Sequence, residues 1–231
     1  MSDRERGTHD DSAFDFVAVA AHELRAPTAA IHQLAATLVE RGPTLGPDQL
    51  AALHRQLARN AARLARLLDE LLDLSRVDSN RLPINRVPIE LHRQIVELVG
   101  ALAGNRAGEF AIEVPRSARP LVDTVVFDRI VGNLITNALR YGRPPMTIAA
   151  GVADGELRLT VEDRGDGVSA DFVPRLFDRF SRDAAAATGR GEGWGLGLAI
   201  AHAYATAHGG ELRYASASPH GARFELVIPG V

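Results

Sequence analysis

The first residues in this chain that could do chemistry are an adjacent histidine and glutamate, His22 and Glu23. Histidine is neutral for much of the time near pH 7, so a free ring nitrogen is available as a base or a nucleophile. A neighbouring carboxylate can accept the proton of the other ring nitrogen and balance positive charge that develops on the ring. The other interpretation is that His22 is an ordinary histidine on a helix surface beside a solvated glutamate.

Two asparagines, Asn133 and Asn137, lie four residues apart in a segment with helical periodicity. This spacing places both carboxamides on one helix face. An oxygen donor there suits Mg²⁺, which keeps waters and phosphate oxygens as its other ligands. Arg140 follows, and its guanidinium can bind phosphate through two N–H groups. The other interpretation is that both asparagines are simply solvated.

Two glycine-rich segments are further candidates for binding a ligand. Asp163, Gly165 and Gly167 follow a predicted strand, and the two glycines allow the backbone to turn tightly. Gly193 to Gly197 precede a predicted helix, where small residues expose several backbone N–H groups to an anion and the helix dipole adds to the attraction. Alone, the first segment is an ordinary turn at a strand end, and the second is weak support for a phosphate site.

The N-terminal part of the chain must position His22. Apolar residues recur at helical spacing over 13–41 and 50–77, and residues 42–47 form a turn between these helices. Residues 1–12 are polar, and we predict a disordered lead; Pro27 predicts a kink or a lost hydrogen bond. Such a hairpin has one apolar face. This face can be buried by dimerisation into a four-helix bundle, or by packing on the rest of the same chain.

The remaining residues show a mixed pattern. Residues 78–88 are predicted to be a linker, and 89–231 a second domain of helices and strands. Partly helical structure is predicted over 171–183. The predicted helices are 91–103, 122–141 and 196–208, and the predicted strands are 110–114, 146–152, 157–163, 211–215 and 223–228.

Composition narrows the class of protein. The 231 residues are 46% hydrophobic and 24% charged, with a formal charge of −3, so nothing indicates nucleic-acid binding. Cysteine is absent, which excludes disulfides and thiolate metal sites, and all basic residues are arginine, so any phosphate-binding cation must be arginine. No apolar run approaches the roughly 20 residues of a membrane helix. We therefore expect a cytoplasmic chain, either complete or the cytosolic part of a longer membrane-bound receptor.

Residues 16–27 resemble the phospho-acceptor box of sensor histidine kinases, F-x-x-x-x-S-H-E-L-R-x-P. The resemblance implies that His22 accepts a phosphoryl group and that Glu23 is the general base. Ala21 replaces the usual serine. Ala26 stands where many relatives have Thr or Asn, a polar group that positions water for dephosphorylating the partner. We therefore expect weak or no phosphatase activity.

The second domain resembles the Bergerat-type (GHKL) ATP-binding fold, with its N, G1, F and G2 boxes in the expected order. The resemblance implies that Asn137 binds Mg²⁺, that Asp163 accepts a hydrogen bond from the adenine amino group, and that residues 181–191 form an ATP lid. The residues it assigns to the nucleotide are Asn133, Asn137, Arg140, Tyr141, Asp163, Gly165, Gly167, Gly193, Gly195, Leu196, Gly197 and Leu198.

Together these resemblances imply an all-α helical hairpin, forming a dimeric four-helix bundle, followed by an α+β sandwich of the Bergerat type. They imply a homodimeric, ATP- and Mg²⁺-dependent protein histidine kinase whose partner is a response-regulator receiver domain. The alternatives are a degenerate kinase that serves as a phosphotransfer scaffold, an ATP-driven switch like the chaperones of this fold, and a serine kinase like the anti-sigma factors.

Overall fold

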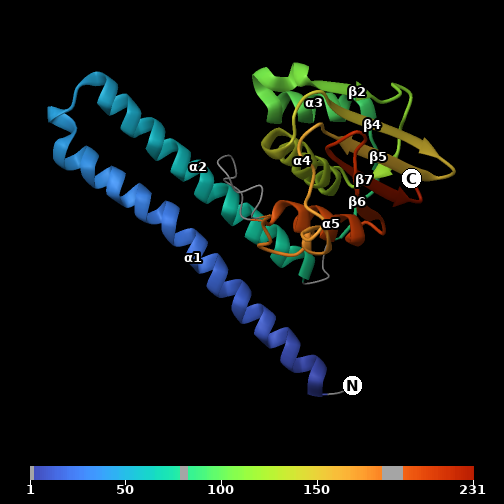
Figure 1. Ribbon diagram of the computed structural model, residues 1–231, viewed down its shortest axis with the longest axis horizontal. Coiled ribbons are helices and arrows are strands. Elements are labelled where there is room, and N and C mark those ends of the chain that lie inside the picture. The colour runs from blue at the N-terminus through green and yellow to red at the C-terminus, as the bar shows by residue number, and fades with distance from the viewer. Residues whose placement is uncertain (1–2, 79–82, 184–194) are drawn as a thin grey trace. The chain divides into compact units, whose positions relative to one another are not determined.

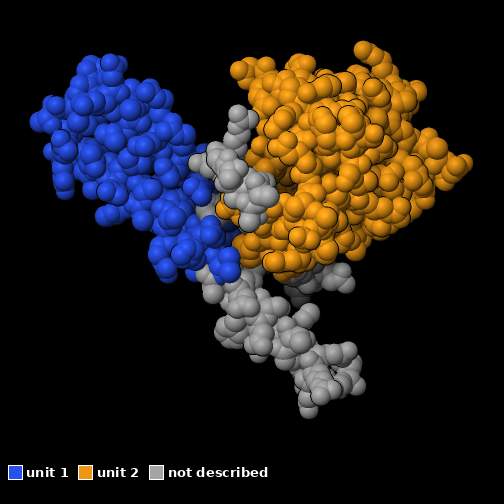
Figure 2. Space-filling view, viewed as in Figure 1, with its two compact units in different colours: residues 1–72 blue, residues 73–231 orange. Residues whose placement is uncertain are grey.

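The computed structural model describes residues 3–78, 83–183 and 195–231. The chain divides into two compact units, residues 1–72 and residues 73–231, coloured blue and orange in Figure 2. None of the helices in the described ranges is long and apolar enough to cross a membrane.

The first unit is a helical hairpin, as predicted (Figure 1). Helix α1 (Asp3–Arg41) leads through a short 3₁₀ turn, η1 (Gly42–Thr44), into α2 (Pro47–Asp78). The helix begins at Asp3, ahead of the predicted start, because the charged residues before Ala13 are compatible with continuing a helix that is already nucleated. Pro27 lies inside α1, which remains helical on both sides of it although the proline ring removes one backbone donor.

The second unit is built on a five-stranded sheet in the order β2-β4-β5-β7-β6 (Figure 1). The β2–β4 pair is parallel, and the remaining neighbours are antiparallel. A separate two-stranded sheet pairs β1 with β3. The strands are β1 (Val87–Pro88), β2 (Phe110–Glu113), β3 (Leu121–Val122), β4 (Met146–Ala153), β5 (Glu156–Glu162), β6 (Glu211–Ser216) and β7 (Ala222–Pro229).

One face of this sheet is buried and the other is polar. On β5 and β7 alternate residues are buried, and Leu159 pairs with Leu226 in register. The opposite face carries charged pairs such as Arg158 with Glu225, at 3.8 Å. This period-two alternation is typical of a sheet covered on one side by helices. The helices of the unit are α3 (Leu91–Ala103), α4 (Thr124–Tyr141) and α5 (Gly197–Ala207).

The predicted helices and long strands of the second unit are confirmed to within two residues. Helix α4 begins at Thr124 instead of Val122, because Val122 pairs in β3 and the Asp123 carboxylate caps the helix by accepting the Val126 N–H at 3.1 Å. The predicted partly helical stretch contains one 3₁₀ turn, η3 (Val173–Arg175). Most of the predicted lid lies outside the described residues.

Residues 79–82 of the predicted linker lie outside the described part of the chain, and both ends of the predicted range belong to elements of the structure. Helix α2 extends to Asp78, strand β1 occupies residues 87–88, and the second unit begins at Asp73, inside the helix. Asp73, the first residue of the second unit, is buried and contacts Arg129 on α4 and Tyr204 on α5.

Candidate active site

Helix α4 is the element around which the predicted nucleotide residues lie. Its apolar face is fully buried, with Phe127, Ile130 and Leu134 at 0% exposure. Asn133 and Asn137 lie off this face and are half-buried. The helix is fixed at its start by Asp123, whose second oxygen accepts the Asn85 N–H at 2.8 Å. The packing of one side of α4 therefore determines where both carboxamides point.

Near the middle of α4, Asn133 lies against the start of α5. A Cβ atom added to Gly197 would lie 3.1 Å from the Asn133 Oδ1, so glycine allows this close approach. Gly195 has a φ of +71°, and a Cβ there would lie 2.4 Å from the Ser181 carbonyl oxygen. Leu196 is buried and Leu198 half-buried beside these glycines. Two of the predicted phosphate-binding segments are thus in contact. Gly193 lies outside the described residues.

At the end of β5, the Asp163 side chain is held rigidly. Its Oδ1 accepts the Gly165 N–H at 2.7 Å and the Ala222 N–H at 3.4 Å. The residue is 5% exposed, and burial raises the pKa of its carboxyl group, while the two backbone hydrogen bonds act in the opposite direction. The Oδ2 atom accepts no hydrogen bond from the described part of the chain, so it can accept one from a ligand.

The C-terminal end of α4 packs directly on this aspartate. A Cβ added to Gly142 would lie 2.6 Å from the Asp163 Cβ, and one added to Gly165 would lie 2.7 Å from the Tyr141 carbonyl oxygen. The Arg164 N–H donates to the Arg143 carbonyl at 3.0 Å. Tyr141 is 40% exposed beside this junction, so its ring can contact a ligand.

Two glycines that hold this site together were missed by the sequence analysis, Gly142 and Gly221. A Cβ on Gly221, which has a φ of +120°, would lie 2.0 Å from the Asp163 carbonyl oxygen. Gly142 directly follows the predicted helix end, which is a detectable signal for a helix C-terminus. Nothing in the sequence indicates that either glycine packs against Asp163.

Helix α4 therefore has two contacts in this region: Asn133 lies against Gly197, and the end of the helix lies against the Asp163 turn, which includes Gly165. Between these two contacts α4 carries Asn137, Arg140 and Tyr141. Gly167, with a φ of +73°, continues the Asp163 turn. Within the described residues, no group of three or more His, Asp or Glu side chains could hold a metal ion.

His22 and Glu23 lie on α1 in the first unit. The His22 side chain is exposed, and Glu23 is half-buried. Ala21, Arg25 and Ala26 are exposed on the same stretch of helix. An exposed imidazole is accessible to a second reactant, which suits a nucleophile.

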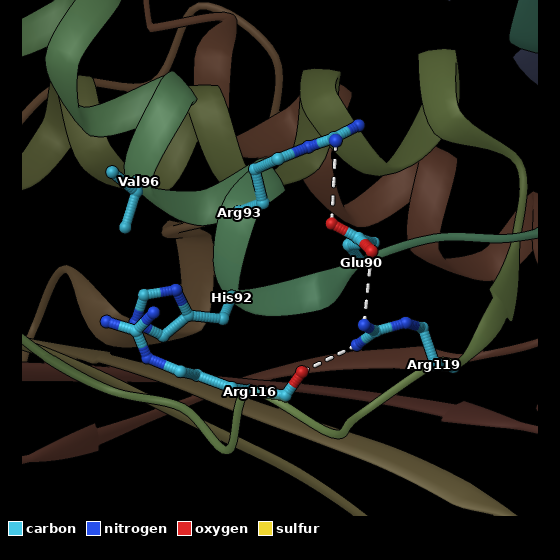
Figure 3. A pocket seen from close by; sticks show the side chains of 6 residues that line it. All are labelled: Glu90, His92, Arg93, Val96, Arg116 and Arg119. Atoms are coloured by element: carbon cyan, nitrogen blue, oxygen red, sulfur yellow. Dashed lines mark hydrogen bonds and ion pairs between the residues drawn. The ribbon is translucent and has the colours of Figure 1, made fainter.

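A pocket of about 480 Å³ lies elsewhere in the second unit, at the N-terminal end of α3 (Figure 3). Glu90 lies between Arg93 and Arg119 and pairs with both, at 3.4 and 3.1 Å. His92, Val96 and Arg116 also line it. None of the predicted site residues lines this pocket, so it is not the predicted nucleotide site.

Two models of known protein families match separate parts of this chain. Residues 13–80 match the model of the His Kinase A (phospho-acceptor) domain. Residues 122–231 match the model of the histidine kinase-, DNA gyrase B- and HSP90-like ATPase. The fold and the site thus define a phospho-acceptor hairpin joined to an ATPase-type domain. The chain belongs to the sensor histidine kinase family of two-component systems.

Individual relatives support the assignment. The chain is 33% identical to the signal transduction histidine-protein kinase AfsQ2 of Streptomyces coelicolor over 93% of its own length, and it spans 41% of that protein. The Acinetobacter baumannii histidine kinase AdeS has the same fold, with a TM-score of 0.73 at 23% identity, covering 90% of this chain and 98% of that one. Histidine kinase ThkA, solved in complex with the response regulator protein TrrA, gives a TM-score of 0.68 at 18% identity, covering 99% of this chain and 65% of that one.

Proposed function

We propose that this chain is an ATP-dependent protein histidine kinase. It phosphorylates its own His22 and passes the phosphoryl group to an aspartate of a response-regulator receiver domain. The observation that carries the proposal is that the Asp163 turn and the start of α5 both pack against helix α4, which contains Asn133. The phospho-acceptor segment of the same chain contains an exposed His22.

Asp163 selects the base. Because two backbone N–H groups hold its Oδ1, the Oδ2 is presented in a fixed direction and accepts a hydrogen bond from the adenine amino group. Guanine has a carbonyl oxygen at the equivalent position, which would face the carboxylate acceptor to acceptor. An unpaired buried polar group is costly, so the site prefers ATP to GTP.

The triphosphate lies between α4 and the start of α5. Backbone N–H groups at the start of α5 and the Arg140 guanidinium bind phosphate oxygens. Asn137 would hold Mg²⁺, and Asn133 would assist at the phosphates. The ion, when bound, would neutralise charge on the phosphate oxygens. Glycine at position 197 allows the start of α5 to approach Asn133 closely, because an added Cβ would lie 3.1 Å from the Asn133 Oδ1.

The chemistry at His22 is an in-line phosphoryl transfer. One ring nitrogen forms a bond to the γ-phosphorus while the bond from that phosphorus to the β,γ-bridging oxygen breaks, and ADP leaves. Glu23 accepts the hydrogen bond or proton of the other ring nitrogen and balances the developing positive charge. Catalysis consists mainly of positioning and charge neutralisation, because the transition state is loose.

The partner and the assembly are inferred from the helical hairpin. The ThkA neighbour was solved with a response regulator, and Ala21, Arg25 and Ala26 offer an exposed surface beside His22 for such a partner. Ala26 has only a methyl group, so it cannot position a water molecule for hydrolysis of the phosphorylated partner, and phosphatase activity is weak or absent. Dimerisation through the hairpin buries exposed apolar residues of α1 and α2. The need for ATP places the reaction in the cytoplasm, whether the chain acts alone or as the cytosolic part of a membrane-bound receptor.

The test is incubation of the purified protein with γ-labelled ATP and Mg²⁺, beside a His22→Ala variant. We expect a label that is labile in acid and stable in alkali, and that is absent from the variant. A label that resists acid would indicate phosphoserine and contradict the proposal. Nucleotide binding without any label would favour the phosphotransfer scaffold.

A further inference from the structure

The pocket at the start of α3 is not explained by the nucleotide site. It has a volume of about 480 Å³ and is lined by residues from two segments of the chain, 90–96 and 116–119. Three of the six lining residues are arginines and one is a glutamate, so the lining has an excess of positive charge. What such a pocket can bind depends on which of these charges the protein itself already pairs.

Two of the three arginines are paired within the protein. Glu90 lies 3.4 Å from Arg93 and 3.1 Å from Arg119, and Arg93 also lies 3.5 Å from Glu97. Arg116 differs from both, because no carboxylate among the described residues lies within ion-pair distance of its guanidinium. Its N–H donors are therefore available to a ligand with anionic oxygens.

The turn that carries Arg116 is fixed to the start of α3. The Arg116 carbonyl oxygen accepts a hydrogen bond from the Arg119 Nη1 at 2.6 Å, and the Ala118 N–H donates to the Pro115 carbonyl at 3.1 Å. The Leu91 N–H in turn donates to the Ala118 carbonyl at 3.3 Å. Because this backbone is already ordered, only the arginine side chain has to be ordered when a ligand binds.

Helix α3 contributes a polar and an apolar side chain to the same pocket. His92 and Val96 are four residues apart, so they share a helix face. In Figure 3 the Arg116 side chain extends to the side of the pocket where these two lie, whereas Glu90 and Arg119 lie on the other side. Val96 is 43% exposed, which leaves apolar surface for a ligand to cover, and a histidine ring can donate an N–H. No described side chain caps the start of α3, so its first N–H groups also favour an anion.

We propose that this pocket binds a small organic anion: Arg116 and His92 hold its phosphate or carboxylate group, and Val96 packs against its apolar body. The volume is within the range of small-molecule sites, roughly 300–1,000 Å³, and it is more than a single phosphate ion fills. None of the residues assigned to the nucleotide lines the pocket, so both sites can be occupied at once. The inference goes beyond the proposed kinase activity and does not depend on it.

The test is an NMR titration of the full chain with assigned backbone amide signals, which separate this pocket from the nucleotide site. The probes are phenyl phosphate, phenylacetate and inorganic phosphate. We expect phenyl phosphate to shift the signals of residues 90–96 and 116–119, and to bind about tenfold more tightly than inorganic phosphate, because its ring covers apolar surface. Tighter binding of phenyl phosphate than of phenylacetate would identify a phosphate monoester as the ligand class, and the reverse order a carboxylate. No shifts in these segments with any probe at millimolar concentration would overturn the proposal.

Two variants test the roles of the lining residues. Arg116→Gln should weaken the binding of phenyl phosphate about tenfold, because it removes a charge-assisted hydrogen bond. Val96→Ser should weaken phenyl phosphate binding roughly threefold and leave inorganic phosphate unchanged, because it removes only apolar contact. Arg158→Gln is the control, since Arg158 pairs with Glu156 on the sheet and does not line the pocket. Equal affinities in Arg116→Gln and Arg158→Gln would contradict the proposed site.

A third variant should act in the opposite direction. Glu90→Gln removes the negative charge from the lining but keeps an oxygen that can accept the Arg119 N–H. We expect phenyl phosphate to bind roughly threefold more tightly to this variant, since a like charge no longer opposes the ligand. A gain in affinity cannot result from a damaged fold, so this result is distinct from a loss caused by misfolding. Weaker or unchanged binding in Glu90→Gln would count against an anion site.

Discussion

Asp163 shows how a single rigid side chain can determine which base is bound. Because its Oδ1 is occupied by the N–H groups of Gly165 and Ala222, an Asp163→Asn variant should keep its oxygen there and turn its NH₂ group toward the base. That group would face the adenine amino group donor to donor. We predict a loss of about 2 kcal/mol, roughly 30-fold in ATP affinity, and a smaller loss for GTP.

Titration calorimetry with both nucleotides measures this effect. Asp166→Asn is the matched control, because its side chain is 83% exposed in the same turn and pairs with Arg143 at the surface. Equal losses of ATP and GTP affinity in Asp163→Asn would argue against a directed contact with the base.

Gly142 is the second residue whose effect can be anticipated. In Gly142→Ala the new methyl group would lie 2.6 Å from both the Ala138 carbonyl oxygen and the Asp163 Cβ, so the end of α4 or the Asp163 turn must shift. We predict destabilisation of about 1–3 kcal/mol, as for other overpacked sites, together with weaker ATP binding. Thermal denaturation and calorimetry check both. Gly151→Ala in β4 meets nothing within 4 Å and should leave ATP binding unchanged.

At the scale of elements, a buried histidine joins the end of α5 to the start of α4. His208 is 1% exposed, and its Nε2 accepts the Asp123 N–H at 3.0 Å. Burial lowers the pKa of His208, since the charged form is poorly solvated and could not accept this hydrogen bond. The lowered pKa means that the unfolded chain binds the proton first as pH falls.

The contribution of neutral His208 to the free energy of unfolding should therefore be complete above the pKa of a histidine in the unfolded chain, about 6.5, and should decline below that pH. Between pH 7.5 and 5.5 we predict that this histidine removes up to about 1.4 kcal/mol from the free energy of unfolding. Urea denaturation at both pH values measures the change. In His208→Gln, whose side-chain oxygen can still accept the Asp123 N–H, the decline should be smaller. The same decline in both proteins would show that other groups are responsible.

Most elements could be predicted because their residues repeat with a clear period. Helix α3 and strand β4 begin at the predicted residues, since apolar spacing and a preceding turn determine each. The strands β1 and β3 were missed, because two residues contain no period. Asp73 was missed for a different reason. On an amphipathic helix an aspartate indicates a solvated face, and its partners Arg129 and Tyr204 lie far away in sequence.

For the candidate site, the spacing of residues in the sequence could be interpreted, whereas their packing could not be predicted. The spacing of Asn133 and Asn137 indicated one shared helix face, and the structure keeps both off the buried face of α4. The close approach of Gly142 and Gly221 to Asp163 depends on how α4 and β7 lie against β5, which only the folded chain determines.

For the whole molecule, the exposed apolar residues of the hairpin predict an assembly. Leu68 and Leu72, one turn apart on α2, are 46% and 56% exposed, and Val39 on α1 is 81% exposed. Such residues are typical of an interface when they gather on one helix face. We predict that the chain is a dimer in light scattering, and that Leu68→Glu with Leu72→Glu makes it a monomer that still binds ATP.

Val125→Glu serves as the control for this prediction. Val125 is 69% exposed on α4 in the second unit, so the added charge should leave the dimer intact. A wild-type monomer, or a dimer that survives both leucine substitutions, would contradict an interface through this face of α2.

The way α4 meets its two neighbours has a consequence for how binding energy is divided. Asn133 contacts the start of α5, and Gly142 contacts the Asp163 turn nine residues later, which corresponds to roughly 14 Å of rise along the axis. A helix of this length is a stiff rod. Substitutions at its two ends should therefore act independently, so that the losses in affinity from Asn133 and Asp163 variants multiply when combined. The base and the phosphates of the nucleotide would then be recognised as two separate anchors.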